Sequence, residues 1–311
     1  MEPFNDQITI MEQRKAKKII SRAGFVLSIL TVVLLAAQLL ITFLVDKYYP
    51  AVAETNWYVW AVTAITIIGF GLPIYALLMR RIPNTPKGEV IKLSPLVFIR
   101  IFFICTAAMY ISNILGGIIT MIIANLKGQK ELLNPIQEVM KNSNFLVAFL
   151  YASIIAPIVE EVIFRKLLLD KLRRFGDLPA ILMTGIAFGL FHMNLSQFFY
   201  AAVLGCIFAY VTIKTNTIRY SILLHMLINF LGTAISPFAI SGNAIAYIFL
   251  LQWMLFSIVV GLICLFYDFK KIKLEKSKMV FINKSDFVLN TGTILYLLLC
   301  IVMIVINTIY S

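Results

Sequence analysis

Long apolar segments recur along the whole chain and constrain its fold more than any other feature of the sequence. Windows of about 20 residues identify nine of them. They cover residues 23–45, 57–79, 96–125, 144–164, 179–193, 197–213, 220–236, 243–267 and 288–310. Because a bilayer offers no water to satisfy backbone N–H and C=O groups, each spanning segment must be a helix. The sequence therefore predicts an all-α, polytopic transmembrane helical bundle of about 8–9 spans, with the fifth and sixth segments short.

The charge of the chain fits this topology. The 311 residues are 61% hydrophobic and 14% charged, with a formal net charge of +12. Lysines and arginines gather before the first segment and in alternate connections after it, whereas the other connections hold few. This asymmetry is typical of cytoplasmic loops and predicts a multi-pass integral membrane protein with a cytoplasmic N-terminus. We expect the lipid bilayer, and no nucleic acid, as the partner of these charges.

The apolar and polar segments divide the chain into four parts. Residues 1–22 form a basic cytoplasmic segment, and 23–143 form the N-terminal transmembrane helices. Residues 144–236 are expected to form a catalytic helical core, followed over 237–311 by C-terminal transmembrane helices with a basic cytoplasmic loop. The first apolar run is too long for a cleavable signal, so we expect it to remain as an anchor.

Ionisable residues inside three apolar segments mark a candidate site. The first group is Glu160, Glu161 and Arg165 in the fourth segment. Such residues are functional by default, because charge in hydrocarbon is costly unless it is paired or faces a cavity. Glu161 and Arg165 are four residues apart and can pair, whereas Glu160 is rotated by about 100°. A structural ion pair would explain Glu161 and Arg165 but would leave Glu160 without a partner. Pro157 is expected to bend the helix just before them.

The chain has two histidines, His192 and His225, and both lie in apolar segments. Phe188 precedes the first by four residues and Asn229 follows the second by four, so each pair projects from one side of its helix. A single histidine on an apolar helix is usually a packing residue, and that alternative stays open for each. Together with Glu160, the two histidines predict a shared polar site and hydrolytic chemistry within the membrane.

The order Glu-Glu-x-x-x-Arg, Phe-x-x-x-His and His-x-x-x-Asn resembles the CAAX protease and bacteriocin-processing family, also called CPBP or Abi. Its members are intramembrane endopeptidases related to the type II CAAX prenyl endopeptidase. The resemblance covers roughly residues 145–235, and every motif position is present. It implies a protease, that is, a hydrolase acting on peptide bonds.

The resemblance also implies a role for each residue. Glu160 would be the general base, taking a proton from a water that His192 also holds. His225 and Asn229 would donate hydrogen bonds to the oxyanion of the tetrahedral intermediate. Three residues would support the site. Glu161 and Arg165 would position Glu160 and its helix, and Phe188 would pack beside the site. We expect hydrolysis without a cofactor. The alternative is zinc bound by Glu160, His192 and His225, although it would consume the proposed oxyanion donor.

The substrate implied by the resemblance is a membrane-associated peptide, either a prenylated C-terminus or a leader peptide. Bacteriocin processing, signal-peptide processing and self-immunity are the corresponding roles. The Phe-, Ile- and Leu-rich composition suggests the plasma membrane of a Gram-positive bacterium and favours a leader peptide. Two other classes stay open. The chain could be a non-proteolytic scaffold or regulator of a sensor or transporter, using Gly116-Gly117 or the basic loop Lys270–Lys284 as partner surfaces. It could also be a transporter with a proton relay.

Overall fold

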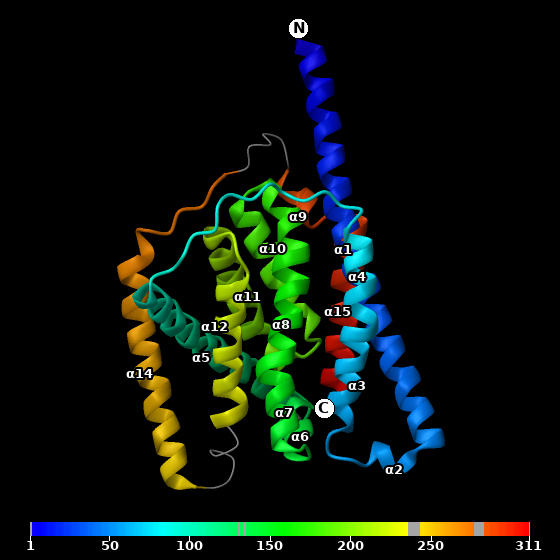
Figure 1. Ribbon diagram of the computed structural model, residues 1–311, viewed down its shortest axis with the longest axis vertical. Coiled ribbons are helices and arrows are strands. Elements are labelled where there is room, and N and C mark those ends of the chain that lie inside the picture. The colour runs from blue at the N-terminus through cyan, green and yellow to red at the C-terminus, as the bar shows by residue number, and fades with distance from the viewer. Residues whose placement is uncertain (1, 130, 133–134, 236–242, 277–282, 311) are drawn as a thin grey trace.

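The fold of the chain, seen in a computed structural model, is a bundle of helices that run mostly along one common direction (Figure 1). The structure describes residues 2–129, 131–132, 135–235, 243–276 and 283–310. Within these ranges there is no strand, and seven helical stretches are long and apolar enough to cross a membrane. They are Ile10–Tyr48, Tyr58–Met79, Pro95–Leu126, Phe145–Phe175, Leu195–Thr215, Ala244–Phe269 and Thr291–Tyr310. The all-α, multi-pass prediction is confirmed.

The first half of the chain contributes three spans. The first span is α1 (Glu2–Tyr48), and the third is the oblique helix α5 (Pro95–Leu126). The second span is formed by three consecutive elements, α3 (Tyr58–Ala64), η1 (Ile65–Gly71) and α4 (Leu72–Met79). Two short helices, α2 (Pro50–Ala53) and α6 (Pro135–Lys141), lie in the connections. The predicted basic segment 1–22 is helical from Glu2 and continuous with the first span. It rises beyond the rest of the bundle at the top of Figure 1.

The predicted core contains the long span Phe145–Phe175, the spanning helix α11 and the two shorter helices α10 and α12. Its elements are α7 (Phe145–Leu150), η2 (Tyr151–Ile155), α8 (Ala156–Glu161), η3 (Val162–Leu169), α9 (Asp170–Leu172), η4 (Arg173–Phe175), α10 (Asp177–Phe191), α11 (Leu195–Thr215), α12 (Arg219–Phe230) and η5 (Leu231–Ile235). The fifth and seventh predicted segments are the shorter helices α10 and α12. The sixth was predicted to be short, which is wrong, because α11 has 21 residues.

Two spans complete the bundle, with a short 3-10 turn before the second. They are α14 (Ala244–Phe269) and α15 (Thr291–Tyr310), preceded by η6 (Lys284–Phe287). Residue 236 of the seventh predicted segment and residues 277–282 of the basic loop lie outside the described residues. Gly116 packs against Phe199 of α11, as ordinary helix packing requires, whereas a side chain at Gly117 would meet open space.

The basic connections meet at one end of the bundle. In the connection 80–94, the backbone N–H of Thr85 donates to the carbonyl of Asp170 over 2.9 Å. At the same end, the N–H of Asp177 donates to the carbonyl of Glu275 over 3.0 Å. The alternate connections singled out by their charge therefore lie together, as a single-sided topology requires.

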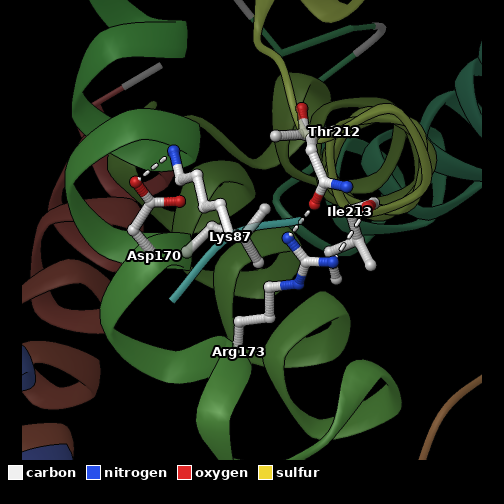
Figure 2. Close-up of a pocket in the computed structure, with 7 residues that line it drawn as sticks. Lys87, Asp170, Arg173, Thr212 and Ile213 are labelled. Atoms are coloured by element: carbon white, nitrogen blue, oxygen red, sulfur yellow. Dashed lines mark hydrogen bonds and ion pairs between the residues drawn. The ribbon is translucent and has the colours of Figure 1, made fainter. Parts of the chain in front are cut away.

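The connection 80–94 is fixed across the end of the core by side chains (Figure 2). Lys87 Nζ lies 2.6 Å from Asp170 Oδ2. Arg173 donates from Nη2 to the carbonyl of Ile213 over 3.0 Å and from Nη1 to Asn216 Oδ1 over 2.6 Å. The Lys87 contact joins the connection 80–94 to the end of the long core span, and the Arg173 contacts join that end to the end of α11.

Helices α10 and α11 approach each other closely because small residues face their contact. A Cβ on Gly185 would lie 2.7 Å from the backbone nitrogen of Cys206, and one on Gly189 would lie 2.8 Å from the Phe198 carbonyl oxygen. Gly205 lies opposite Gly185. Small residues allow such approach where membrane helices associate by van der Waals packing.

The turn at Gly176 sets the depth of the site. Gly176 has φ 103°, a conformation that favours glycine, and it reverses the chain between η4 and α10. Glu160 lies 15 residues before Phe175, and His192 lies 15 residues after Asp177. At 1.5 Å per residue both are about 22 Å from the turn. The antiparallel hairpin therefore brings Glu160, in the fourth predicted segment, level with His192 at the far end of the fifth.

We predict that Gly185→Ala lowers the free energy of unfolding by about 1–3 kcal/mol, because its Cβ would overlap Cys206. Gly117→Ala is the matched control, because its Cβ meets no atom within 4 Å. The control should be neutral or stabilising by up to about 1 kcal/mol, the helix preference of alanine over glycine. Thermal melting of both purified variants in detergent micelles measures the difference. Equal melting temperatures would contradict the close packing.

Candidate active site

A fully buried ion pair lies at the base of the candidate site. The side chains of Glu161 and Arg165 are both 0% exposed, and Arg165 Nη1 is 3.1 Å from Glu161 Oε1. Arg165 Nη2 also donates to the carbonyl of Gly205 over 3.2 Å. The guanidinium carbon lies 4.5 Å from the ring centroid of Phe188 and 5.5 Å from that of Phe208. The charge of Arg165 is therefore held by a carboxylate, a carbonyl and two aromatic faces.

His225 of α12 connects this ion pair to Glu160. Its Nδ1 is 3.1 Å from Glu161 Oε1, and its Nε2 is 3.7 Å from Glu160 Oε2. A carboxylate accepts, so we assign the Nδ1 hydrogen to the bond with Glu161. Nε2 then faces Glu160, whose side chain is 15% exposed and is the less enclosed of the two glutamates. The partner that Glu160 lacks on its own helix thus comes from α12.

His192 joins the site through Phe188. His192 Nδ1 bonds the carbonyl of Phe188, one turn earlier in α10, over 2.9 Å. The ring of Phe188 lies between the two histidines, with centroids 4.9 Å from His192 and 5.6 Å from His225, and it is nearly perpendicular to both. Because a carbonyl only accepts, Nδ1 carries the hydrogen, and the Nε2 lone pair of neutral His192 is left for another donor. Among the described side chains, His192 and Glu160 form no hydrogen bond or ion pair with each other.

Asn229 holds the helix of Glu160 to α12. The N–H of Ala156 bonds the carbonyl of Tyr151, which is the i to i−5 pairing of a π-helix. In the same pairing, the N–H of residue 157 would donate to the carbonyl of Ala152. Residue 157 is a proline and has no N–H, so this carbonyl receives no backbone hydrogen bond from it. Asn229 Nδ2 donates to this carbonyl over 2.8 Å. The amide of Asn229 thus replaces the hydrogen bond that proline removes.

The structure adds two residues of α11 that the sequence analysis missed. Gly205 supplies the carbonyl that Arg165 binds, and Phe208 packs on both Arg165 and His225. The ring of Phe208 lies 5.2 Å from His225 with an interplanar angle of 31°. A glycine and a phenylalanine in an apolar span carry no chemical signal, so only the packing of α11 against the core reveals them.

The zinc alternative requires Glu160, His192 and His225 to converge on one point. In the described part of the chain, no three histidine, cysteine, aspartate or glutamate side chains gather in a way that could hold a metal ion. Nδ1 of His225 is directed to Glu161, and Nδ1 of His192 is directed to a backbone carbonyl, so Nε2 is the ring nitrogen of each histidine that is left for another partner. Glu160, His192 and His225 are therefore not gathered as three metal ligands in this placement.

Comparisons with known proteins find similarity over the core of the chain. Residues 142–231 match the family model described as "Type II CAAX prenyl endopeptidase Rce1-like". The chain is also 27% identical over 163 residues to "Putative membrane peptidase YdiL" of Bacillus subtilis (strain 168). That alignment covers 51% of this chain and 64% of the relative. No solved structure matches the chain.

The fold and the site define a multi-pass membrane protein with a buried glutamate–histidine centre. The family match contains all seven residues singled out in the sequence: Glu160, Glu161, Arg165, Phe188, His192, His225 and Asn229. The predicted resemblance to the CAAX protease and bacteriocin-processing family is confirmed over this core.

We predict that Arg165→Met lowers the free energy of unfolding by about 3–5 kcal/mol, because it leaves Glu161 as an uncompensated buried charge. The double variant Glu161→Gln/Arg165→Met removes both charges and should recover most of this loss. Chemical denaturation in mixed micelles measures both. If the losses of unfolding free energy caused by the two single substitutions simply added up in the double variant, the ion pair would be contradicted.

We predict that Asn229→Ala lowers the free energy of unfolding by about 1–3 kcal/mol, because the carbonyl of Ala152 loses its hydrogen-bond donor. Pro157→Ala supplies an N–H at the position that lacks one, so Pro157→Ala/Asn229→Ala should be less destabilised than Asn229→Ala alone. The control is Asn142→Ala, which removes an amide bond to the Glu138 carbonyl at an exposed site where water can replace it. Thermal melting in micelles reports all three. No rescue by Pro157→Ala would count against the proposed backbone role.

Proposed function

We propose that the protein is an intramembrane endopeptidase that hydrolyses peptide bonds with a water activated by Glu160. The observation that supports this most is the pairing of Glu160 Oε2 and His225 Nε2 across 3.7 Å, with the Glu161–Arg165 pair buried behind them. The family match and the relative named as a membrane peptidase support the same reaction class. Glu160 is the less enclosed of the two glutamates, as a residue that meets substrate must be.

The proposed reaction starts at Glu160. Its carboxylate takes a proton from a water as the water oxygen forms a bond to the scissile carbonyl carbon. The electron pair of the carbonyl moves onto oxygen and gives a tetrahedral oxyanion. Glu160 then returns the proton to the departing amine as the C–N bond breaks, which leaves an acid and an amine and regenerates the carboxylate.

His225 is the proposed oxyanion donor. Two carboxylates face one guanidinium in this cluster, so a protonated His225 would make the cluster neutral. It would then donate from Nδ1 to Glu161 and from Nε2 into the gap beside Glu160. A preorganised donor in a site without bulk water stabilises a developing oxyanion strongly, and one donor is worth about 2.7–4 kcal/mol in other hydrolases.

The other residues hold the reactants in place. The free Nε2 lone pair of His192 would accept a hydrogen bond from the attacking water, the role implied by the family resemblance. Asn229 uses one amide hydrogen on Ala152, so its donation to the oxyanion would come from the second. Glu161 and Arg165 act through His225 and the helix of Glu160, and are positioning residues.

The proposed substrate is a peptide associated with the bilayer, lipidated or carrying a leader. The protein is an integral multi-pass membrane protein, and we place it in a bacterial plasma membrane with the N-terminus and the basic end of the bundle in the cytoplasm. Bacteriocin or signal-peptide processing, or self-immunity, is the role we infer from the resemblance. A scaffold or regulator that binds a membrane protein without cleaving it is the competing function.

We predict that Glu160→Gln abolishes cleavage, with a rate reduced at least about 100-fold, because the amide cannot accept the proton from water. Comparative proteomics of membranes and secreted peptides, from a deletion strain carrying wild-type or variant chain at matched levels, measures this and identifies the substrate. Glu138→Gln is the control, since Glu138 is an exposed glutamate that pairs with Lys141 outside the site.

The scaffold function gives the opposite result. Under that function, Glu160→Gln would restore the deletion strain as well as wild type, and no peptide would differ between the two. Melting temperatures of the purified variants show whether any loss reflects chemistry rather than folding.

A further inference from the structure

A groove between α1 and α15 lies outside the proposed active site. Its volume is about 810 Å³, and it opens on the side of the bundle where α15 begins. The two helices cross at Gly24 and Gly292, where the N–H of Gly292 donates to Ser21 Oγ over 3.0 Å. Their side chains diverge beside this crossing and leave the groove between them.

The α1 wall of the groove is cationic. Arg14, Lys17, Lys18 and Arg22 line it, and no carboxylate does so among the described residues. Lys17 is neutralised by Asp286, whose Oδ1 is 3.0 Å from Lys17 Nζ. The other three are exposed and form no ion pair within the part of the chain that the structure describes.

The three unpaired cations form one stripe. Arg14, Lys18 and Arg22 are each four residues apart, so they lie one above another on the same face of α1. Like charges at this spacing repel and destabilise a helix. An anion lying against the stripe would offset this repulsion.

The α15 wall of the groove is apolar. Ile294, Leu295 and Leu298 line it, and their side chains are 39%, 41% and 57% exposed. They belong to the first two turns of a spanning helix, so they lie where hydrocarbon begins, whereas the cations of α1 lie at its headgroup boundary. The groove therefore joins a cationic surface to an apolar one in the order that a phospholipid requires.

We propose that this groove binds one anionic phospholipid, with its phosphate against Arg14, Lys18 and Arg22 and an acyl chain along Leu295 and Leu298. Basic pockets between spanning helices at the cytoplasmic boundary suit anionic headgroups. Arginine is especially suited to the phosphate, because its planar fork offers paired donors. The bound lipid would fasten α1 to α15 beside the crossing of Gly24 and Gly292.

Native mass spectrometry of the purified full chain tests the proposal. The protein is held in dodecyl maltoside micelles with dioleoyl phosphatidylglycerol, or with dioleoyl phosphatidylcholine at the same concentration. We expect one phosphatidylglycerol retained with at least about tenfold preference over phosphatidylcholine. The triple variant Arg14→Gln/Lys18→Gln/Arg22→Gln should lose this preference. Equal retention of the two lipids by wild type, or an unchanged preference in the triple variant, would overturn the site.

Matched variants distinguish lipid binding in the groove from a general effect of surface charge. Lys15→Gln removes a charge from the same helix outside the groove, and it should keep the preference. Arg14→Lys/Arg22→Lys keeps the charges and should also retain it. If the triple variant does not fold, the single variants Arg14→Gln, Lys18→Gln and Arg22→Gln replace it, each with an expected loss of about two- to threefold. Loss in Lys15→Gln equal to that in these variants would contradict a defined site.

Glycerol 3-phosphate distinguishes a lipid from a free phosphate. It carries the same phosphate without acyl chains, so at the concentration of the lipid it should leave no adduct and should not displace phosphatidylglycerol. If it binds as tightly as the lipid, the apolar wall of α15 contributes nothing and the proposal of a phospholipid site fails.

Discussion

The buried ion pair of Glu161 and Arg165 is the interaction on which the arrangement of the site depends. A charge without a partner in a bilayer is costly, and both of these side chains are fully buried. Arg165 is stabilised by Glu161, by the Gly205 carbonyl and by the rings of Phe188 and Phe208. These contacts come from three different helices, so the charge can be buried only when the helices are assembled around it.

The ion pair also orients His225 toward Glu160, the two residues proposed to face the substrate. Glu161 Oε1 fixes Nδ1 of His225, and the opposite nitrogen of the same ring then faces Glu160. Asn229 holds α12 to the π-helical segment before Glu160, at the carbonyl that Pro157 leaves without a donor. The two adjacent glutamates therefore have different surroundings. Glu161 is enclosed and orients the histidine, and Glu160, the proposed general base, is the more exposed of the two.

The sequence predicted these groups because polar residues in apolar segments are conspicuous. The spacing of four residues predicted that Glu161 and Arg165 share a face, and the structure brings them together. The role of Asn229 toward Ala152 could not be predicted, because it depends on a local change from α- to π-helical pairing. Gly205 and Phe208 were missed since they look like ordinary residues of a span. The length of α11 was underestimated because polar residues at its ends reduce the apolar signal.

The orientation of His225 tests the account most directly. Nitrogen-15 spectra of the histidine-labelled protein in bilayers report which ring nitrogen carries hydrogen, and the chain has only two histidines. A sample with His192→Gln assigns the remaining signals to His225. We predict that Nδ1 of His225 carries a hydrogen and is hydrogen-bonded. A bare Nδ1 with the hydrogen on Nε2 alone would contradict the bond to Glu161 and the site built upon it.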